Sequence, residues 1–289
     1  MGTKGSIMKI ERKVFVVTGG GNGIGREVVL GLLAQGARVA IVDRRTDDIL
    51  ETIRLAGAGA ERVSSHLVDV TDEAAVAALP AQVEQVHGQV DGLVNVAGII
   101  QHFVRFADLT EAEMTTVMDV NFWGVVRMCK GFLPLLSARP EACVVNVSSM
   151  GAFAPVPGQT VYGASKAAVK LFTEGLYAEL RGTPVAVTAV YPGGVATGIA
   201  EHSGARIPGT GPADGKSAEK LAASLTSPQE AARRIIGGIE RGSYRVVIGK
   251  DATMLDRLSR LAPQRATELI ATKMAALLAP DPEAARVSG

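Results

Sequence analysis

Tyr162 and Lys166, four residues apart, are the two side chains of this sequence best suited to proton transfer. On a helix this spacing places both on one face, where the ammonium can sit beside the phenolic oxygen and favour its ionised form. Bringing a phenol from a pKa of about 10 to neutrality takes roughly 4 kcal/mol, which one cation at ~4 Å in an effective dielectric of ~20 supplies. The spacing alone is common on ordinary helices, so its meaning depends on the rest of the chain.

A glycine-rich turn upstream provides the second half of a possible site. Residues 18–25 read Thr-Gly-Gly-Gly-Asn-Gly-Ile-Gly, between a strand-like run and a helical pattern. Glycines let the backbone approach a pyrophosphate, and the following helix N-terminus offers unpaired N–H groups and positive dipole character. The position of this turn between a strand and a helix predicts a dinucleotide cradle. Its candidate residues are Gly19, Gly21, Asn22, Gly23, Ile24 and Gly25.

Asp43 ends the second strand-like run, 18 residues beyond Gly25. At that distance a carboxylate can accept hydrogen bonds from the adenosine ribose hydroxyls and repel a 2′-phosphate, which favours NAD over NADP. Arg44 and Arg45 follow directly, and an arginine could instead pair with that phosphate. Asn22 stands where a basic residue would have helped a phosphate and therefore also favours NAD. The plain alternative is that Asp43 is a turn residue at a strand end.

Strand-like and helix-like segments alternate along the chain. Short apolar, β-branched runs, most of them continuous, indicate strands covered on both faces. Strand followed by helix, repeated, predicts an α/β fold with a doubly wound parallel sheet of about seven strands. The expected strands are residues 14–18, 38–42, 63–68, 92–96, 143–147, 185–190 and 245–248; the expected helices are residues 24–35, 73–87, 111–136, 161–181 and 228–241.

The composition is that of one soluble globular domain. The chain has 289 residues, 47% of them hydrophobic, and a formal net charge of +1, so no basic footprint for nucleic acid is present. Cys129 and Cys143 lie in apolar segments and are expected to be reduced core residues, and the four histidines form no ligand pattern, so no metal is expected. Without an apolar run of ~20 residues or a signal-peptide pattern, we expect a cytoplasmic protein with no stable membrane insertion.

Four segments are expected along the chain. Residues 1–12 are interpreted as an N-terminal tip, disordered or partly derived from expression, and residues 13–250 as one catalytic domain. Residues 196–227 are rich in Gly, Ala, Pro and Ser, include Gly209-Thr210-Gly211-Pro212, and are interpreted as a substrate flap. Residues 251–289 are predicted to form a C-terminal extension of one or two amphipathic helices interrupted by Pro263, packed on the domain or on a second subunit.

Taken together, these motifs resemble the short-chain dehydrogenase/reductase superfamily over residues 13–248. The glycine turn is similar to the family's own, and the Asn-Val-Ala-Gly sequence of residues 95–98 departs from its Asn-Asn-Ala-Gly pattern at Val96. The resemblance implies the strand order 3-2-1-4-5-6-7 and a homodimer or homotetramer. It also adds cofactor contacts at Asp69, Val70, Asn95, Ala97, Gly98, Pro192, Gly193, Val195 and Thr197.

The resemblance also assigns the catalytic roles. Ser149 lies 13 residues before Tyr162, as the family's serine does, with Ser148 as a neighbouring alternative. Tyr162 would act as general base in oxidation and as general acid in reduction, and Ser149 would donate a hydrogen bond to the substrate oxygen. Lys166 would lower the pKa of Tyr162 and bind the nicotinamide ribose. Asn121 would hold a water that relays protons from Lys166, although a helical asparagine can equally satisfy a local backbone group.

The predicted function is hydride transfer between NAD(H) and a secondary alcohol or carbonyl compound. Apolar residues flank the expected site and indicate a lipophilic substrate, with Gln101 as the nearest polar group to orient it. The alternatives are a dinucleotide-sensing protein without turnover and an oligomeric or membrane-surface scaffold acting through residues 252–278. The flanking apolar residues, which could equally be lid packing, are Ile99, Ile100, Phe103, Met150, Phe153, Ala154 and Val156.

Overall fold

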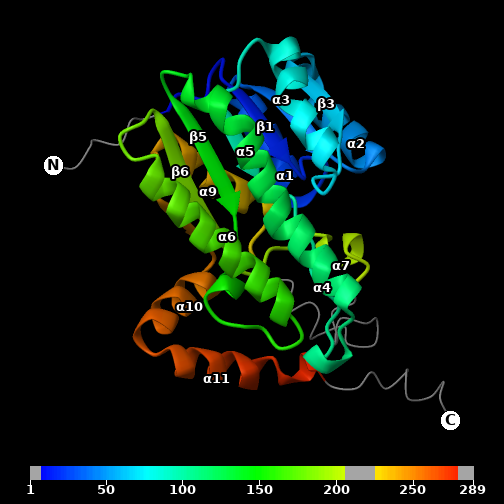
Figure 1. Cartoon of the computed structure of the whole chain (residues 1–289), viewed down its shortest axis with the longest axis vertical. Coiled ribbons are helices and arrows are strands. Elements are labelled where there is room, and N and C mark those ends of the chain that lie inside the picture. The colour runs from blue at the N-terminus through cyan, green and yellow to red at the C-terminus, as the bar shows by residue number, and fades with distance from the viewer. Residues whose placement is uncertain (1–7, 206–224, 279–289) are drawn as a thin grey trace.

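A computed structural model describes residues 8–205 and 225–278 of the chain. Seven parallel strands form one sheet in the order β3-β2-β1-β4-β5-β6-β7, which confirms the predicted fold class and strand order (Figure 1). The strands are β1 (Val14–Thr18), β2 (Arg38–Asp43), β3 (Val63–Leu67), β4 (Gly92–Asn95), β5 (Ala142–Val147), β6 (Val185–Pro192) and β7 (Arg245–Ile248).

Helices cover both faces of this sheet, which is why its central strands are continuous apolar runs. Every residue of β1, β4 and β5 is buried. One face packs against α1 (Gly23–Ala34), α2 (Thr46–Ala56) and α9 (Pro228–Glu240). The other packs against α3 (Glu73–His87), α5 (Gly124–Ser137) and α6 (Thr160–Glu179). Both cysteines, predicted to be core residues, are buried, and burial raises the pKa of each thiol to about 12.

The order of the strands places a crevice beside β1. The chain leaves β1 toward β2 and later returns on the other side as β4, so the connections after β1 and β4 diverge. Such a switch point at the carboxyl edge is where open parallel sheets bind ligands. The glycine turn follows β1, and Asp43 ends β2 on the same edge. The fold therefore brings the predicted dinucleotide residues together.

Three expectations about the elements were incomplete or wrong. Residues 8–12 are part of the domain, because Met8 and Ile10 are each only 3% exposed and the Met8 N–H bonds the Glu240 carbonyl at 3.0 Å. Helix α2 was missed, although Ile49, Ile53 and Ala56 lie on one face of it and pack against the core. The helix expected over residues 111–136 is α4 (Glu111–Met118), a π-helical turn (Asp119–Trp123) and α5.

The C-terminal extension begins with α10 (Lys250–Leu261) and continues through α11 (Pro263–Lys273) to a short turn (Ala275–Leu278). Both helices lie at one end of the molecule, beyond the carboxyl end of β5 (Figure 1). Pro263 starts α11, a position where its missing N–H has no helical partner to lose. The extension packs on the domain, because Leu255, Ala266 and Ile270 form one apolar cluster with Ala154.

Parts of the predicted segments lie outside the described residues. These parts are residues 1–7 of the tip, residues 206–224 of the flap with Gly209-Thr210-Gly211-Pro212, and residues 279–289 of the extension. Within the described part of the flap, α7 (Ile199–His202) is a single short helix, and Val195 bridges to Thr226 in parallel. The Ala196 N–H also bonds the Thr226 carbonyl at 2.9 Å.

Candidate active site

A cavity opens at the carboxyl edge of the sheet, over the crevice beside β1. The ends of β1, β2 and β4, the start of α1 and the segment after β6 form its walls. Most of the predicted cofactor residues meet here. The residues that line the cavity are Gly19, Asn22, Gly23, Ile24, Gly25, Val42, Asp43, Arg44, Arg45, Val68, Asp69, Val70, Val96, Ala97, Gly98, Ile99, Val120, Thr197, Ile199 and His202.

The glycine turn has the backbone that the sequence predicted. Gly19 and Gly23 have φ values of +65° and +51°, where side chains are strained. A Cβ at Gly19 would lie 2.9 Å from the Cα and N of Ala97, and one at Gly25 would overlap the Gly19 carbonyl. The turn therefore packs directly on the backbone after β4. Larger residues at Gly19 or Gly25 would close the cradle.

The N-terminus of α1 is free to receive an anion. Asn22 stands at the N-cap, but its side chain makes no capping hydrogen bond and its Nδ2 donates instead to Asp48 at 3.0 Å. No acidic side chain lies in the first turn of α1. The first amides of the helix thus keep their hydrogen-bonding capacity and positive dipole character for a pyrophosphate. The residues present fit a dinucleotide.

Asp43 lies at the edge of the cavity with 8% of its surface exposed. Its Oδ2 accepts from the Gly21 N–H at 2.9 Å and its Oδ1 from the Arg45 N–H at 3.2 Å. These bonds hold the carboxylate against the glycine turn, and each oxygen keeps a second lone pair for a ribose hydroxyl. Gly21 does not line the cavity, and its contribution is the backbone N–H that holds the Asp43 carboxylate.

Two of the predicted cofactor contacts make structural hydrogen bonds, and of these two Asp69 also lines the cavity. Asn95 does not line the cavity; its side chain is buried in the sheet and donates to the Asn146 Oδ1 at 2.8 Å. The Asp69 carboxylate accepts from the backbone and hydroxyl of Thr71 at 2.9 and 2.8 Å, which shapes the loop that presents Val70. Thr18, which the sequence analysis did not single out, accepts the Ala97 N–H at 3.2 Å and orders the wall after β4.

Tyr162 and Lys166, on α6, do not line this cavity themselves, but the Lys166 Nζ lies directly beside its wall at Gly98. The Lys166 Nζ lies 5.9 Å from the centre of the Tyr162 ring and donates to the Val147 carbonyl at 3.2 Å. A Cβ at Gly98, a cavity residue, would lie 3.0 Å from that Nζ. The Ser149 hydroxyl lies close enough to the Tyr162 phenol to lower its pKa, and a Cβ at Gly151 would lie 3.5 Å from the Ser149 Oγ and 3.6 Å from the Tyr162 Cε1. The predicted serine, tyrosine and lysine are therefore neighbours.

The electrostatics of this pair differ from the simple expectation. Burial raises the pKa of the Tyr162 phenol above its ordinary value, and only the Ser149 hydrogen bond opposes this effect. Burial also lowers the pKa of Lys166 to about 8, because this residue is only 3% exposed. The lowering of the Tyr162 pKa by Lys166 stays a prediction: the Nζ lies 5.9 Å from the ring centre and donates to the Val147 carbonyl at 3.2 Å. Burial is the main influence on the phenol in this arrangement.

Ser148 is separated from the site by its own hydrogen bond. Its hydroxyl is 2% exposed and donates to the Lys166 carbonyl at 2.7 Å, so it fastens α6 to the end of β5. Ser149 instead starts the turn at residues 150–152, where its Oγ accepts the Gly151 N–H at 3.1 Å while contacting Tyr162. Of the two serines, Ser149 is the one whose hydroxyl faces the phenol.

Asn121 lies in the π-helical turn between α4 and α5 and is fully buried. Its Oδ1 accepts the Ile99 N–H at 2.8 Å, and its Nδ2 donates to the Ile99 carbonyl at 2.9 Å and to the Ser165 hydroxyl at 3.0 Å. Both amide protons are used, so this side chain clamps the loop after β4 to α6. Asn121 thus satisfies local backbone groups, which is the alternative that the sequence left open. Its Oδ1 and the Lys166 Nζ both lie beside Gly98.

The segment after β6 closes the cavity from the other side. Thr197 lines the cavity, and its Cγ2 would lie 3.3 Å from a Cβ at Gly23. The Gly193 N–H bonds the Ile248 carbonyl at 2.8 Å, and the Gly194 N–H donates to the Asp251 Oδ2 at 2.8 Å. Asp251 was not predicted, because only the tertiary fold brings the start of α10 to this segment. Pro192 ends β6 and Val195 packs on the core.

The expected substrate residues have divided roles. Ile99 lines the cavity, whereas Met150, Phe153, Ala154 and Val156 pack with α10 and α11 in one cluster. Gln101 does not face a substrate: its Oε1 accepts the N–H groups of Val161 and Tyr162 at 2.8 and 2.9 Å, so it caps the first turn of α6. The lid-packing alternative therefore holds for the loop after β5. Gln101 positions the helix that carries Tyr162.

The described residues contain neither a metal-binding cluster nor a membrane-spanning helix. Over residues 8–205 and 225–278, no cluster of three or more His, Cys, Asp or Glu side chains is suited to hold a metal ion. In the same residues, no helix combines the length and apolar character needed to cross a bilayer.

Comparisons with known proteins agree with this geometry. The model of the short chain dehydrogenase family matches residues 13–207. A Mycobacterium tuberculosis protein named as oxidoreductase SadH is 37% identical over 274 residues, covering 92% of this chain and 96% of its own. A short-chain dehydrogenase/reductase from Burkholderia phymatum, solved in complex with NAD, superposes with a TM-score of 0.79 at 23% identity, covering 90% of this chain and 97% of that one. A short-chain dehydrogenase from Streptomyces avermitilis gives a TM-score of 0.75 at 29% identity, with 92% and 97% covered.

Proposed function

The chain belongs to the short-chain dehydrogenase/reductase family and is an oxidoreductase of it. From this premise we propose that it transfers a hydride between NAD(H) and a secondary alcohol or carbonyl compound, with Tyr162 as the general acid and base. The observation that carries the proposal is that Ser149, Tyr162 and Lys166 are neighbours and that Lys166 lies beside Gly98, a residue of the same cavity that the glycine turn lines.

The chain's own residues would hold the coenzyme along the cavity. The free amides at the start of α1 suit the pyrophosphate, and Asp43 suits the adenosine ribose hydroxyls. Lys166 suits the nicotinamide ribose, and the segment from Pro192 to Thr197 suits the nicotinamide amide. When bound, the nicotinamide ring supplies the acceptor or donor of the hydride.

Proton transfer falls to the chain itself. In oxidation, Tyr162 takes the proton of the substrate hydroxyl as the C–H bond gives up its hydride; in reduction it returns that proton to the oxygen. Ser149 donates a hydrogen bond to the same oxygen and stabilises its developing charge. The Lys166 ammonium forms no ion pair with a carboxylate of the described residues, so an ionised Tyr162 would supply its counter-charge. Phenol and ammonium then titrate as a coupled pair.

Asn121 would serve as a positioning residue. Its side chain fixes both main-chain groups of Ile99 and the hydroxyl of Ser165, one residue before Lys166. Because both amide protons of Asn121 are engaged, a water that relays protons from Lys166 would have to bind to other atoms of the π-helical turn. Loss of this side chain is expected to displace Lys166 as well as the cavity wall.

The experiment that tests the proposal is a panel of secondary alcohols and ketones, followed by the absorbance of the reduced coenzyme with both NAD and NADP. We expect turnover with NAD on lipophilic members of the panel, because Ile99 and the apolar loop after β4 face the nicotinamide end. Coenzyme binding with no turnover of any member in either direction would favour the dinucleotide-sensing alternative. The homodimer or homotetramer and the cytoplasmic location stay predictions.

A further inference from the structure

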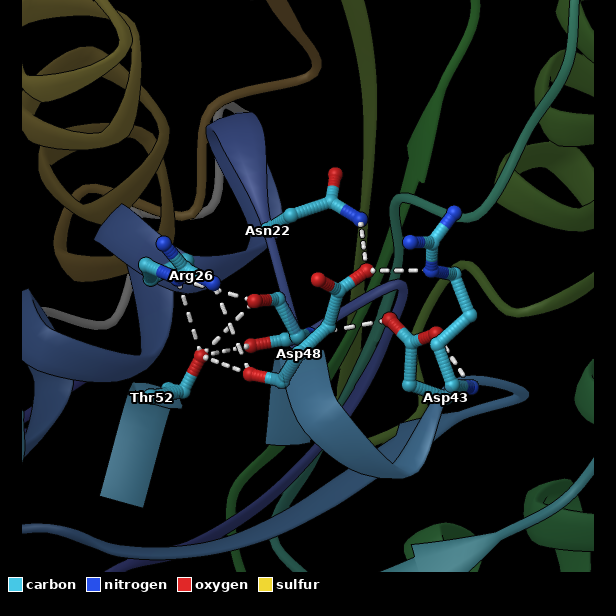
Figure 2. A network of polar contacts seen from close by, with 8 residues as sticks. Asn22, Arg26, Asp43, Asp48 and Thr52 are labelled. Atoms are coloured by element: carbon cyan, nitrogen blue, oxygen red, sulfur yellow. Dashed lines mark hydrogen bonds and ion pairs between the residues drawn. The ribbon is translucent and has the colours of Figure 1, made fainter. Parts of the chain in front are cut away.

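A polar network joins the glycine turn to the first turn of α2, beside the cavity (Figure 2). Asp48 is its centre. The Asp48 Oδ2 accepts from the Asn22 Nδ2 at 3.0 Å and pairs with the Arg45 Nε at 3.0 Å. The side chain of Asp48 is 16% exposed and that of Arg45 is 49% exposed. One carboxylate oxygen thus holds both an amide and a guanidinium that line the cavity.

Asp48 is held firmly in this position. Thr52, one turn later on α2, is fully buried and donates to the Gly21 carbonyl at 2.9 Å. The Arg26 Nε donates to the same carbonyl at 2.8 Å and to the Thr52 hydroxyl at 3.0 Å. Figure 2 shows these contacts on the far side of Asp48 from Asp43. Since α2 is fastened to the turn independently of the Asp48 carboxylate, changing that carboxylate should leave the helix in place.

Asp43 and Asp48 pack together on the glycine turn, where the adenosine ribose of a dinucleotide is expected. A Cβ at Gly21 would lie 2.8 Å both from the Asp43 Oδ2 and from the Asp48 Cβ, so the two residues pack on the same point of the turn. Arg45 donates its backbone N–H to Asp43 at 3.2 Å and its side chain to Asp48. The cation best placed to neutralise a 2′-phosphate is therefore already paired, and its partner adds a second negative charge.

We propose that Asp48 is a second determinant of coenzyme choice, which rejects the 2′-phosphate of NADP by holding Arg45 and Asn22 and by its own charge. This inference rests on the proposed function, in that the cavity binds a nicotinamide dinucleotide. Asp43 alone would leave Arg44 and Arg45 free to compensate its charge, as their sequence position suggests. With Asp48 in place, Arg45 is paired, and Arg44 is the one of these two arginines that contacts no carboxylate of the described residues.

The test is the pair of dissociation constants for NADH and NADPH, measured by direct titration on wild-type and variant proteins. Asp48→Asn keeps the size of the side chain and removes its charge. One unit charge at about 6 Å in an effective dielectric of about 40 changes an affinity about tenfold. We therefore expect Asp48→Asn to tighten NADPH binding about tenfold and to change NADH binding less than about twofold. Adding Arg45→Ala should remove part of the gain, because the freed guanidinium provides that part.

The matched control is Asp47→Asn, which removes the same charge from the same exposed first turn of α2 one residue away. It should leave the ratio of the two constants within about twofold of wild type. An unchanged ratio in Asp48→Asn, or an equal shift in Asp47→Asn, would overturn the role of Asp48 while NADH binding keeps the proposed function intact. Wild-type protein that binds neither coenzyme would overturn both. If Asp48→Asn does not fold, Asp48→Ser also removes the charge, and its ratio of NADH and NADPH dissociation constants tests the same role.

Discussion

Lys166 shows how burial changes the chemistry of a familiar spacing. The spacing of four residues, which places Tyr162 and Lys166 on one helix face, was enough to predict that the ammonium and the phenol are neighbours. The sequence did not predict that both would be desolvated, with the pKa of Lys166 lowered to about 8 and that of Tyr162 raised. The spacing of residue types predicts which ionisable groups are neighbours. The pKa values of those groups depend in addition on how far the whole fold buries them from water.

Replacing Lys166 by Met should therefore shift the pH dependence of alcohol oxidation. At pH values below about 8 the wild-type lysine is charged and stabilises the tyrosinate, so its loss should move the rising limb of kcat/KM to higher pH. Lys170→Met is the control, since Lys170 lies one turn further along α6 and pairs with Glu174 at 2.9 Å. Initial rates across the pH range provide the profile. A lower rate with an unshifted profile would mean that Lys166 acts on binding alone.

His87 should make the fold sensitive to acid. Burial, with the nearby charges of Arg38 and His66, lowers the pKa of His87 to about 4 from its ordinary 6.5. Between those values the unfolded chain binds a proton that the folded chain does not, so stability is full above pH 6.5 and falls as the pH drops toward 4. At pH 5 the loss from this residue is about 1–2 kcal/mol.

His87→Gln should flatten that acid limb. The variant has no titrating group at this position, so its Tm should fall less than that of the wild type between pH 7 and pH 5. Comparing the two slopes, not the absolute Tm values, separates the proton linkage from any cost of the substitution itself. Parallel slopes would show that His87 does not carry the acid sensitivity.

Among the elements, those with a local sequence pattern were predicted, whereas contacts between distant segments were not. The glycine turn, the continuous strands and the order of helix and strand follow from neighbouring residues, and the structure has them. Helix α2 is an exception, since it was missed although Ile49, Ile53 and Ala56 lie on one face of it. The packing of α10 and α11 on the loop at residues 150–156 could not be foreseen either, because an amphipathic helix indicates that an apolar face is covered without indicating by what.

Asp251 links the C-terminal extension to the segment after β6. Asp251→Ala removes the acceptor of the Gly194 N–H and should lower stability by about 1 kcal/mol and weaken coenzyme binding several-fold, because that segment then loses its anchor. Asp251→Asn should restore most of both properties, since its amide oxygen can accept the same bond. Thermal unfolding and coenzyme titration measure the two effects. Equal behaviour of the Ala and Asn variants would show that the anchor is not the hydrogen bond.

For the molecule as a whole, one sheet edge gathers the residues proposed for coenzyme binding and for proton transfer. The glycine turn, Asp43 and the wall after β4 lie at the carboxyl ends of β1, β2 and β4, and Ser149 follows β5. Helix α6, on the face of the sheet opposite to α1, carries Tyr162 and Lys166. Hydrogen bonds from Gln101, Ser148 and Asn121 hold α6 in place, and no sequence spacing predicted these bonds. These contacts couple the site to the packing of the whole domain.

Tyr162→Phe provides the decisive comparison, with NADH affinity and turnover measured on the same preparation. The ring and its contacts remain, so NADH should bind as it does to the wild type, while turnover should fall by at least the ~10² to 10⁴ that general acid–base catalysis contributes. Near-normal turnover in this variant, with NADH still bound, would show that another group moves the proton and that the assignment made from Ser149, Tyr162 and Lys166 is wrong.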